Sequence, residues 1–352
     1  MKEITVSAPG RVCLFGEDVD YMNLEVITLA VNRRINVQGR VHDDKKIIIN
    51  LKDFNKKIEF NNELQPIQTR RDYIASSYNM YQPFLNKNFG AEIEINSTIP
   101  IGKGLSSSSA FCLALVGFFD KVTNLCSSKK DLALKAYAAE VVNLGEAGGM
   151  MDHFASVLGN LLYLECREPY FYEKLNAKFT SLVIGDTLEK KETVETIRKR
   201  KQEINQGIEK AKESFQNFDL IKFPLKKIQK LYEKSPTTGL KRLIGILGIR
   251  DVVRAGYNLL KHETVKEAKF IELLNTHHNF QQKYFENVTR KMQNLIEKAK
   301  EVGALGCKLL GSGNGGSFLV YAPGKEKEVI ESISKSGGEA YLVYQDKGLE
   351  YS

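Results

Sequence analysis

The chain has 352 residues, a formal net charge of +8 and five cysteines, and these values exclude several classes of protein. No stretch approaches the ~18–20 consecutive apolar residues of a membrane-spanning helix, and the scattered cysteines form no Cys-x-x-Cys pair, so we expect a cytoplasmic protein with reduced thiols and neither a membrane anchor nor a zinc finger. The lysines are mixed with glutamates and lack the interleaved aromatic residues of an RNA-stacking surface, which argues against nucleic acid as a partner.

The first part of the chain is predicted to be rich in strands. Residues 1–6 begin directly with a strand pattern, and runs rich in β-branched residues at 25–31, 35–41 and 46–51 predict three more strands. A helix is expected near 71–85. The sequence therefore predicts that most of a sheet precedes the first helix.

A charged motif lies among these strands at residues 8–21, with the sequence Ala-Pro-Gly-Arg-Val-Cys-Leu-Phe-Gly-Glu-Asp-Val-Asp-Tyr. It places Arg11 and the three carboxylates of Glu17, Asp18 and Asp20 around two glycines. The proline and the glycines predict a constrained turn around Arg11, and the alternative is an arginine in a surface salt bridge. The motif is therefore a candidate part of a functional site.

The most informative segment is the run Pro-Ile-Gly-Lys-Gly-Leu-Ser-Ser-Ser-Ser-Ala at residues 100–110. It lies between a strand pattern at 91–96 and an apolar helix pattern at 111–116. Gly102 and Gly104 let backbone N–H groups approach a ligand, and the start of the helix adds unpaired donors and a positive dipole end. Triphosphates suit this geometry, with an ordinary helix cap as the alternative. The spacing matches neither a Walker loop nor a dinucleotide fingerprint.

The remaining elements complete two expected α+β domains, 1–168 and 169–352, which share one cleft. In chain order they begin with a helix at 130–143, a Gly-Gly-Met-Met-Asp-His motif at 148–153 and strands at 160–165 and 180–185. A solvated Lys/Glu-rich helical stretch follows to about residue 234 and contains the basic run 198–201. The chain then forms a later helix and strand, the glycine cluster 311–316 and a strand at 318–321. No repeat or low-complexity tract separates the two halves.

Taken together, the four motifs resemble those of the GHMP kinases, the family of galactokinase, homoserine kinase, mevalonate kinase and phosphomevalonate kinase. The resemblance is strongest to galactokinases, whose first motif is Pro-Gly-Arg-Val-Asn-Leu-Ile-Gly-Glu-His-Thr-Asp-Tyr. The main departure is Asp18, which stands where galactokinases have the histidine that touches the sugar. The resemblance implies an α+β, two-domain fold. Its N-terminal mixed α/β domain carries the glycine-serine phosphate loop, its C-terminal domain is ferredoxin-like, and the active site lies in the cleft between them.

The resemblance also implies roles for individual residues. Asp152 would be the catalytic base that takes the proton of the attacking hydroxyl, and Arg11 would stabilise the developing charge. Ser108 and Glu140 would hold Mg²⁺, the cofactor that accompanies ATP. The implied contacts to ATP and its phosphates are Gly102, Gly104, Leu105, Ser106, Ser107 and Ser108. The implied contacts to the acceptor are Glu17, Asp18, Asp20, Tyr21, Gly313 and Gly315.

Several of these residues have a plainer alternative role. Asp152 follows Gly-Gly-Met-Met and could cap a helix, and Glu140 could be a solvated helix residue, with Glu146 as the metal ligand in its place. His153 is expected to pack or to support its neighbours, because the family has glutamine at that position. The glycine cluster 311–316 could be only a tight turn before a strand.

These observations predict an ATP-dependent kinase that phosphorylates a hydroxyl of a monosaccharide, so its partners are ATP and a small polyhydroxylated molecule. Mevalonate, a heptose or a polyol are the alternative acceptors. A catalytically silent relative that senses sugar is a different class of function. It is disfavoured because the base, the cation and both metal ligands are all present in the sequence. We expect a monomer or a homodimer.

Overall fold

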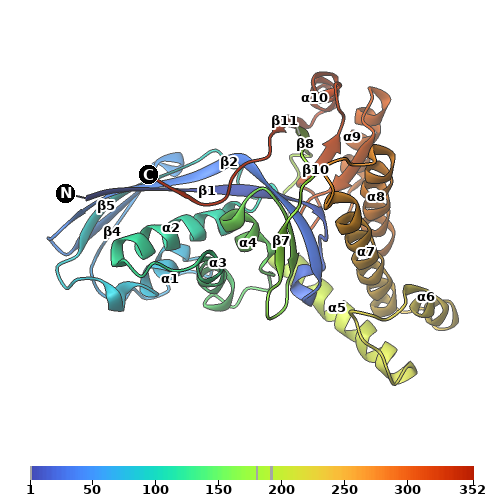
Figure 1. The fold of residues 1–352 in the computed structure, drawn as a ribbon, viewed down its shortest axis with the longest axis horizontal. Helices are drawn as coiled ribbons and strands as arrows, with labels where there is room; N and C mark the ends of the chain where they lie inside the picture. The colour runs from blue at the N-terminus through green and yellow to red at the C-terminus, as the bar shows by residue number, and fades with distance from the viewer. Residues whose placement is uncertain (1, 180, 191–192) are drawn as a thin grey trace.

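The computed structural model describes residues 2–179, 181–190 and 193–352, and the strands of these residues form an eight-stranded and a four-stranded sheet. In the larger sheet six strands follow the order β12-β1-β2-β5-β3-β4, while β6 pairs with β2 and β7 with β6. These strands are β1 (Lys2–Phe15), β2 (Glu25–His42), β3 (Lys46–Leu51), β4 (Lys56–Asn61), β5 (Gly90–Ser97), β6 (Leu161–Glu165), β7 (Tyr172–Lys174) and β12 (Glu350–Tyr351). Because β12 returns to β1, both termini lie at the same end of the molecule (Figure 1).

The long strands β1 and β2 form the centre of the larger sheet. Their antiparallel register runs from Lys2 opposite Val41 to Phe15 opposite Ile27, and it shifts between Pro9 and Gly10 and again between Cys13 and Phe15. The predicted turn around Arg11 is therefore wrong. Proline and glycine are tolerated within β1 because they lie at such an irregularity in the ladder.

The strand β2 replaces two strands that the sequence predicted separately. Its first part, Glu25 to Leu29, pairs with β6, and its second part, Ile35 to His42, pairs with β5. The intervening polar residues mark a change of partner and not a break in the strand. A pattern of alternating polarity cannot distinguish these two cases, because the backbone stays extended through both.

Helices cover one face of the larger sheet (Figure 1). They are α1 (Tyr73–Asn79), α2 (Ser107–Thr123), α3 (Lys129–Tyr137) and α4 (Met151–Leu158). The ring of Phe119 makes T-shaped, edge-to-face contacts with the rings of Tyr78 and Phe118, and all three side chains are fully buried. This core fixes α2 on the sheet, so the loop before Ser107 is held between the strand β5 and a rigid helix.

The smaller sheet belongs to the second half of the chain. Its order is β11-β8-β10-β9, and all of its neighbouring strands are antiparallel. The elements are β8 (Leu182–Asp186), α8 (Glu267–Phe280), α9 (Arg290–Glu301), β9 (Gly306–Leu309), β10 (Ser317–Tyr321), α10 (Glu326–Lys335) and β11 (Glu339–Val343). Helices therefore separate β8 from β9 and β10 from β11, which is the β-α-β-β-α-β order of a ferredoxin-like fold.

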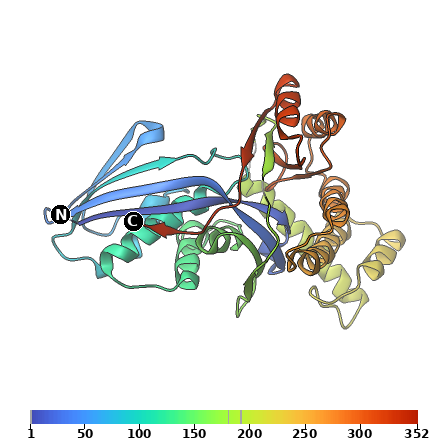
Figure 2. The ribbon, with the colours of Figure 1, turned by 45° about the horizontal axis from the view of Figure 1, so that its top comes forward.

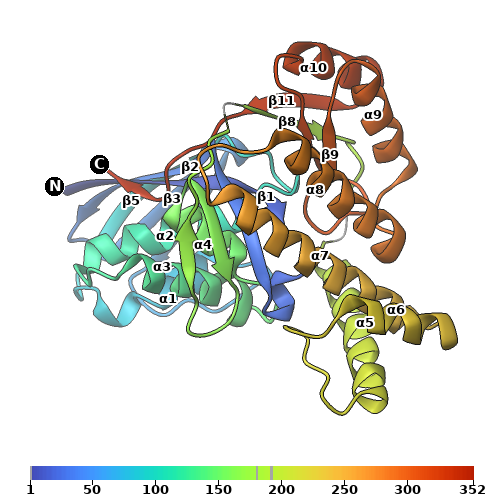
Figure 3. The ribbon, with the colours of Figure 1, turned by 45° about the vertical axis from the view of Figure 1, so that its right-hand side comes forward.

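Three further helices project from the body of the second half (Figure 2, Figure 3). They are α5 (Thr193–Ser214), α6 (Leu225–Lys234) and α7 (Thr238–Leu260). An apolar cluster that includes Ile228, Leu243 and Leu247 joins them. The end of α7 packs on the larger sheet, because a Cβ on Gly256 would lie 2.7 Å from the ring of Phe15.

Short helical turns complete the structure and account for several differences from the predicted boundaries. The 3₁₀ turns are Asp20–Met22, Lys52–Phe54 and Gln82–Phe84, and the π-helical turns are Ala138–Val142 and Gln281–Phe285. The helix predicted at 71–85 is therefore α1 followed by a 3₁₀ turn, and the helix predicted at 130–143 is α3 followed by a π turn. The strand predicted from Thr180 begins at Leu182, and Thr180 itself lies outside the described residues.

No helix among the described residues is long and apolar enough to cross a membrane. The division of the chain after residue 168 stays a prediction. Both β7 and β12 follow that position in the sequence, yet they pair within the larger sheet.

Candidate active site

A cavity of about 780 Å³ brings together segments that are far apart in the sequence. Its wall includes the end of β1, the loop before α2, the start of α4, Ile197 of α5, and residues 311–312 between β9 and β10. The predicted site residues on this wall are Arg11, Glu17, Asp18, Asp20, Tyr21, Gly102, Gly104, Ser106, Ser107, Ser108, Glu140 and Asp152. The alternative metal ligand Glu146 lies there as well.

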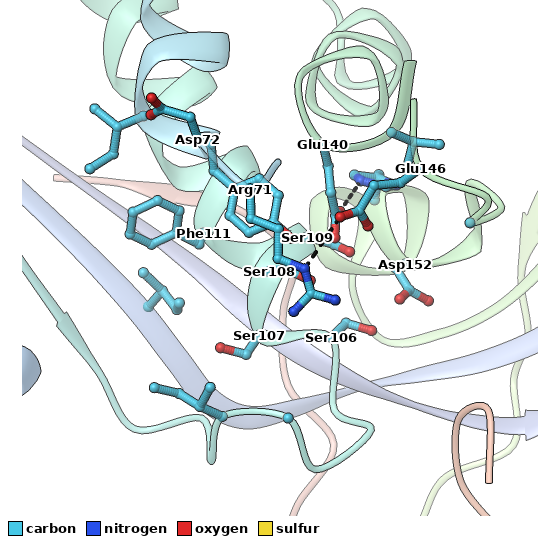
Figure 4. Close-up of a pocket in the computed structure, with 18 of the residues that line it drawn as sticks. Arg71, Asp72, Ser106, Ser107, Ser108, Ser109, Phe111, Glu140, Glu146 and Asp152 are labelled. Atoms are coloured by element: carbon cyan, nitrogen blue, oxygen red, sulfur yellow. Dashed lines mark hydrogen bonds and ion pairs between the residues drawn. The ribbon is translucent and has the colours of Figure 1, made fainter. Parts of the chain in front are cut away.

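The glycine loop forms one part of this wall. Gly102 and Gly104 adopt φ angles of +72° and +81°, and Ser106, directly before α2, has a φ of 59°. The hydroxyl of Ser106 makes no capping bond, so it is buried without a partner. The N–H groups of the first turn of α2 have no acceptor within the helix, which makes this end of the helix suited to an anion. Figure 4 shows the four serines along this turn.

Three predicted contacts lie off the cavity wall. Leu105 is fully buried in the core, although its carbonyl accepts the backbone N–H of Arg11 at 3.2 Å. Gly313 has a φ of +78°, and an added Cβ would lie 2.5 Å from the carbonyl oxygen of Asn287. A Cβ on Gly315, where φ is +114°, would lie 3.0 Å from Glu189. Close packing of the chain on itself therefore explains both glycines.

Arg11 and Asp152 form the central ion pair of the cavity. The Nε and NH2 atoms of Arg11 each lie 2.6 Å from Oδ1 of Asp152, and its NH1 donates to the carbonyl of Gly104 at 2.7 Å. Burial alone lowers the pKa of Arg11, but the negative charges of Asp152 and Glu17 outweigh it and raise that pKa. Arg11 thus joins the acid of α4 to the glycine loop. Asp152 is the second residue of α4 and not its cap, because the N-cap position is Met150.

Asp20 packs against the motif that carries Asp152. A Cβ on Gly149 would lie 2.1 Å from Oδ2 of Asp20, so the glycine is required for this approach. Burial, together with the negative charges of Asp152 and Glu17, raises the pKa of Asp20 to about 8. At neutral pH this carboxyl group is therefore mostly protonated and can donate a hydrogen bond.

Glu17 is held by residues of the second half of the chain. Its Oε1 accepts the N–H of Gly311 at 2.8 Å and lies 3.7 Å from Nζ of the fully buried Lys308. The N–H of the preceding residue, Gly16, donates to Nε2 of His277 at 3.1 Å. Burial and the charge of Lys308 lower the pKa of His277 well below its usual value, which agrees with a neutral ring that accepts at Nε2. None of these partners was predicted.

Asp18 has a buried partner that the sequence reading missed. Its Oδ1 forms an ion pair with NH1 of Arg200 and accepts the hydroxyl of Tyr21 at 3.2 Å. Arg200 lies on α5 and is only 5% exposed, so the prediction that the basic run 198–201 lies on a solvated face is wrong for this residue. The sequence spacing did indicate this burial, because Arg200 stands four residues before the buried Ile204 and therefore lies on the same face of the helix.

The candidate metal ligands lie beside the glycine loop (Figure 4). Nε2 of His153 is 2.6 Å from Oε2 of Glu140, so His153 supports Glu140 and makes no bond to Asp152 among the described contacts. Burial raises the pKa of Glu140, but the hydrogen bond and charge of His153, with hydrogen bonds from Ser108 and Ser109, outweigh it and lower that pKa. An ionised carboxylate beside serine hydroxyls fits Mg²⁺, which needs few protein ligands when a phosphate supplies others.

A second ion pair on the cavity wall joins Arg71 and Glu146. Nε of Arg71 lies 3.3 Å from Oε1 of Glu146, and burial raises the pKa of Glu146. Figure 4 shows the Arg71 guanidinium in front of the serine-rich turn of α2. Glu146 is therefore engaged by an arginine, whereas Glu140 contacts His153 through Oε2 and receives hydrogen bonds from the serines of the α2 turn. This difference favours Glu140 as the metal ligand.

Comparisons with known protein families match three parts of the chain. Residues 72–160 match the GHMP kinases N terminal domain, residues 262–339 match GHMP kinases C terminal, and residues 1–41 match the galactokinase galactose-binding signature. Together these regions contain most of the cavity wall described above.

Individual relatives match along nearly the whole chain. A mevalonate kinase of Pyrococcus abyssi is 27% identical over 348 residues, which cover 95% of this chain and 93% of the relative. A galactokinase of Thermococcus kodakarensis is 27% identical over 349 residues, which cover 96% and 93%.

Solved structures share the fold. The galactokinase of Lactococcus lactis, complexed with galactose, superimposes with a TM-score of 0.85 at 21% identity and covers 99% of this chain and 95% of its own. The mevalonate kinase of Methanococcus jannaschii gives a TM-score of 0.73 at 19% identity, with 98% and 99% covered. The chain therefore belongs to the GHMP kinase family, with its two-domain α+β fold, and is an ATP-dependent phosphotransferase that acts on an alcohol.

Proposed function

We propose that this chain transfers the γ-phosphoryl group of ATP to a hydroxyl of a monosaccharide, with galactose or a related neutral sugar as the first candidate. The observation that carries this proposal is the pairing of charges at the acceptor end of the cavity. Among the described residues, the buried Arg11 on the wall pairs with Asp152, and the wall carboxylates Asp18 and Glu17 pair with Arg200 and Lys308, two buried cations that are not part of the wall. A charged acceptor group beside these residues would find no buried cation without a partner among the described residues, whereas a polyol needs none. The two lysines of the wall, Lys56 and Lys57, are exposed.

The proposed chemistry follows from the contacts of Asp152. Phosphoryl transfer requires positioning and charge stabilisation more than covalent participation by the protein. In our proposal Asp152 takes the proton of the attacking hydroxyl, and Arg11, bonded both to Asp152 and to the Gly104 carbonyl, holds that base next to the phosphate loop. The backbone N–H groups at the start of α2 would bind the phosphates.

Mg²⁺ fits this arrangement as the cofactor of ATP. The residues that would hold it are Glu140 and Ser108, whose hydroxyl lies beside that carboxylate. A bound Mg²⁺ would neutralise charge on the phosphates during transfer. The chain's own contribution is to keep Glu140 ionised, because the contact with His153 favours the carboxylate.

Mevalonate is the second candidate acceptor, because several relatives of similar identity are mevalonate kinases. The galactokinase signature at residues 1–41 supports a sugar instead. A heptose or a polyol would also satisfy the charge argument. A silent sugar-sensing relative is disfavoured, since the cavity keeps a base, a cation and a metal-binding carboxylate together.

A substrate panel tests the proposal directly. Purified protein is incubated with Mg·ATP and, in separate reactions, neutral monosaccharides, polyols, a heptose and mevalonate, while ADP release is followed by a coupled assay. We expect release with at least one neutral sugar and none above background with mevalonate. Turnover of mevalonate alone would defeat the proposal. Sugar binding without any release of ADP would support the silent, sensing alternative.

A further inference from the structure

The second half of the chain builds a polar wall around Asp18. Asp18 has a φ of 68°, a conformation that costs free energy for a residue with a side chain. It is held there by the ion pair with Arg200, by the hydroxyl of Tyr21, and by Nδ2 of Asn287, which is 3.4 Å from its Oδ2. All four side chains are buried or nearly so. The carboxylate of Asp18 is thus already bonded to protein groups, so Asp18 alone does not account for recognition of an acceptor.

The same wall fixes the backbone of Ser312. NH2 of Arg200 donates to the carbonyl of Ser312 at 3.1 Å, and Nδ2 of Asn287 donates to the same oxygen at 3.2 Å. The next residue, Gly313, packs so tightly on Asn287 that a Cβ would not fit. Two donors and a close backbone contact therefore hold Ser312 in one position at the edge of the cavity.

The hydroxyl of Ser312 has no partner among the described residues. The residue is 5% exposed and belongs to the cavity wall, yet its Oγ forms no hydrogen bond to this part of the chain. A buried hydroxyl without a partner costs free energy, so such groups in a native protein call for an explanation. A ligand that enters the cavity and bonds to Oγ would remove this cost.

We propose that Ser312 is a specificity-determining residue whose hydroxyl binds a hydroxyl of the uncharged acceptor, with Arg200 and Asn287 as positioning residues that hold its backbone. The inference rests on the proposed function, because it names the part of that site that reads the sugar. A hydroxyl is the appropriate partner, since it can both donate to and accept from Oγ. The family resemblance assigned the neighbouring glycines to the acceptor but not this serine.

Removal of the single hydroxyl gives a clean test with a matched control. Ser312→Ala keeps the backbone, because Ser312 does not have a positive φ angle. The control is Ser317→Ala in β10, which removes another buried, unpartnered hydroxyl that lies off the cavity wall. We expect Ser312→Ala to raise the KM for the sugar by about 3- to 10-fold, the loss of one neutral hydrogen bond, with an unchanged KM for ATP. Ser317→Ala should leave both values unchanged.

Monodeoxy derivatives of the best sugar identify the bonded hydroxyl. For the wild type, one derivative should lose the same 3- to 10-fold, and Ser312→Ala should turn over that derivative and the parent sugar equally well. Two results would overturn the inference while leaving the sugar kinase intact. One is identical kinetics for Ser312→Ala and Ser317→Ala, and the other is a Ser312→Ala variant that discriminates against every derivative to the same extent. Failure of all sugars in the panel would instead remove the proposed function, and the inference with it.

Discussion

Asp152 and Arg11 show how one contact can set the chemistry of a whole cavity. Arg11 is nearly inaccessible and donates from two nitrogens to Oδ1 of Asp152, while Oδ2 has no hydrogen-bond partner among the residues that the structure describes. The free oxygen is the acceptor that a general base needs. Arg11 therefore orients Asp152 as well as balancing its charge, and these two effects distinguish the proposed base from an ordinary surface aspartate.

Asp152→Asn should abolish most turnover while preserving nucleotide binding. Asparagine keeps the shape and the contact with Arg11 but cannot take a proton, so we expect kcat to fall by about 10²- to 10⁴-fold. ATP affinity, measured by calorimetry, should change little because the phosphate loop is untouched. Asp43→Asn, at an exposed position, serves as the control. Full activity of Asp152→Asn would point to another base or to a base-free mechanism.

Asp20 predicts a pH dependence of stability. Its pKa in the folded protein is about 8, raised by burial, whereas an unfolded aspartate titrates near ~3.9. Between these values the folded state holds a proton that the unfolded state has lost. The free energy of unfolding should therefore fall as pH rises from about 4 to about 8, by at most about 1.4 kcal/mol per pH unit from this group.

The measurement compares urea unfolding of the wild type and Asp20→Asn across that range of pH. The asparagine variant cannot titrate, so its stability relative to the wild type should increase steadily with pH. Parallel pH profiles for the two proteins would mean that Asp20 has the same pKa in both states.

At the scale of elements, the glycine loop makes a paired prediction. Gly102 and Gly104 both adopt a left-handed conformation, but a Cβ on Gly104 would lie 3.0 Å from the carbonyl oxygen of Leu310, whereas a Cβ on Gly102 would meet nothing. Gly102→Ala should therefore cost about 1–2 kcal/mol of unfolding free energy from backbone strain alone. Gly104→Ala should cost about 1–3 kcal/mol more, because Leu310 belongs to the second half and must move.

Chemical denaturation of both alanine variants provides the check. A matched loss of stability would show that the loop does not press on Leu310 in solution. The larger loss for Gly104→Ala, together with a weaker affinity for ATP, would show that the second half supports the phosphate loop.

Elements with a strong pattern could be predicted from the sequence, and their contacts could not. The strand β5 and the start of α2 were predicted because alternation changes to an apolar helix at a glycine-serine loop, which is local information. Lys103 lies in that loop, and its ion pair with Asp186 of β8, at 2.6 Å, was not predicted. The pair joins the loop before α2 to a strand of the smaller sheet, and no local feature of either segment indicates the other.

The same limit applies to the candidate site. The charged motif at residues 8–21 and the Asp152 motif were recognised as parts of one site through resemblance, and the structure brings both to one cavity. Arg200 and Asn287 were missed because each lies in a segment whose pattern is that of an ordinary helix or loop. Ser312 was missed although it belongs to the glycine cluster 311–316, because only the glycines of that cluster were assigned to the acceptor. Their role depends on three-dimensional proximity to Asp18, which a single sequence does not encode in any readable spacing.

At the scale of the whole molecule, ion pairs connect the two halves across the cavity. Lys103 meets Asp186, Lys308 lies near Glu17, and Arg200 meets Asp18. In each pair one residue belongs to the part of the chain that forms the larger sheet and the other to the later part. These largely buried ion pairs therefore fix the positions of the two halves relative to each other.

The Asp18–Arg200 pair allows this coupling to be measured. Asp18→Asn or Arg200→Gln alone leaves a buried charge without its partner, so each should lower the free energy of unfolding by about 3–5 kcal/mol. The double variant removes both charges and should lose clearly less than the sum, with an interaction energy of about 1–3 kcal/mol in a double-mutant cycle. A matched cycle on the exposed pair Lys269–Glu272, also in close contact at 2.7 Å, should show almost no coupling.

The same variants connect this coupling to function. The double variant should fold and should still hydrolyse ATP or transfer its phosphoryl group. Because Arg200 also holds the carbonyl of Ser312, this variant should discriminate less between sugars than the wild type. Urea unfolding gives the cycle, and kcat/KM for two epimeric sugars gives the discrimination. Additive losses of stability would mean that Asp18 and Arg200 do not interact in solution. If the folded double variant kept the sugar preference of the wild type, the ion pair would have no part in recognition of the acceptor. The pair would then serve only to join the two halves.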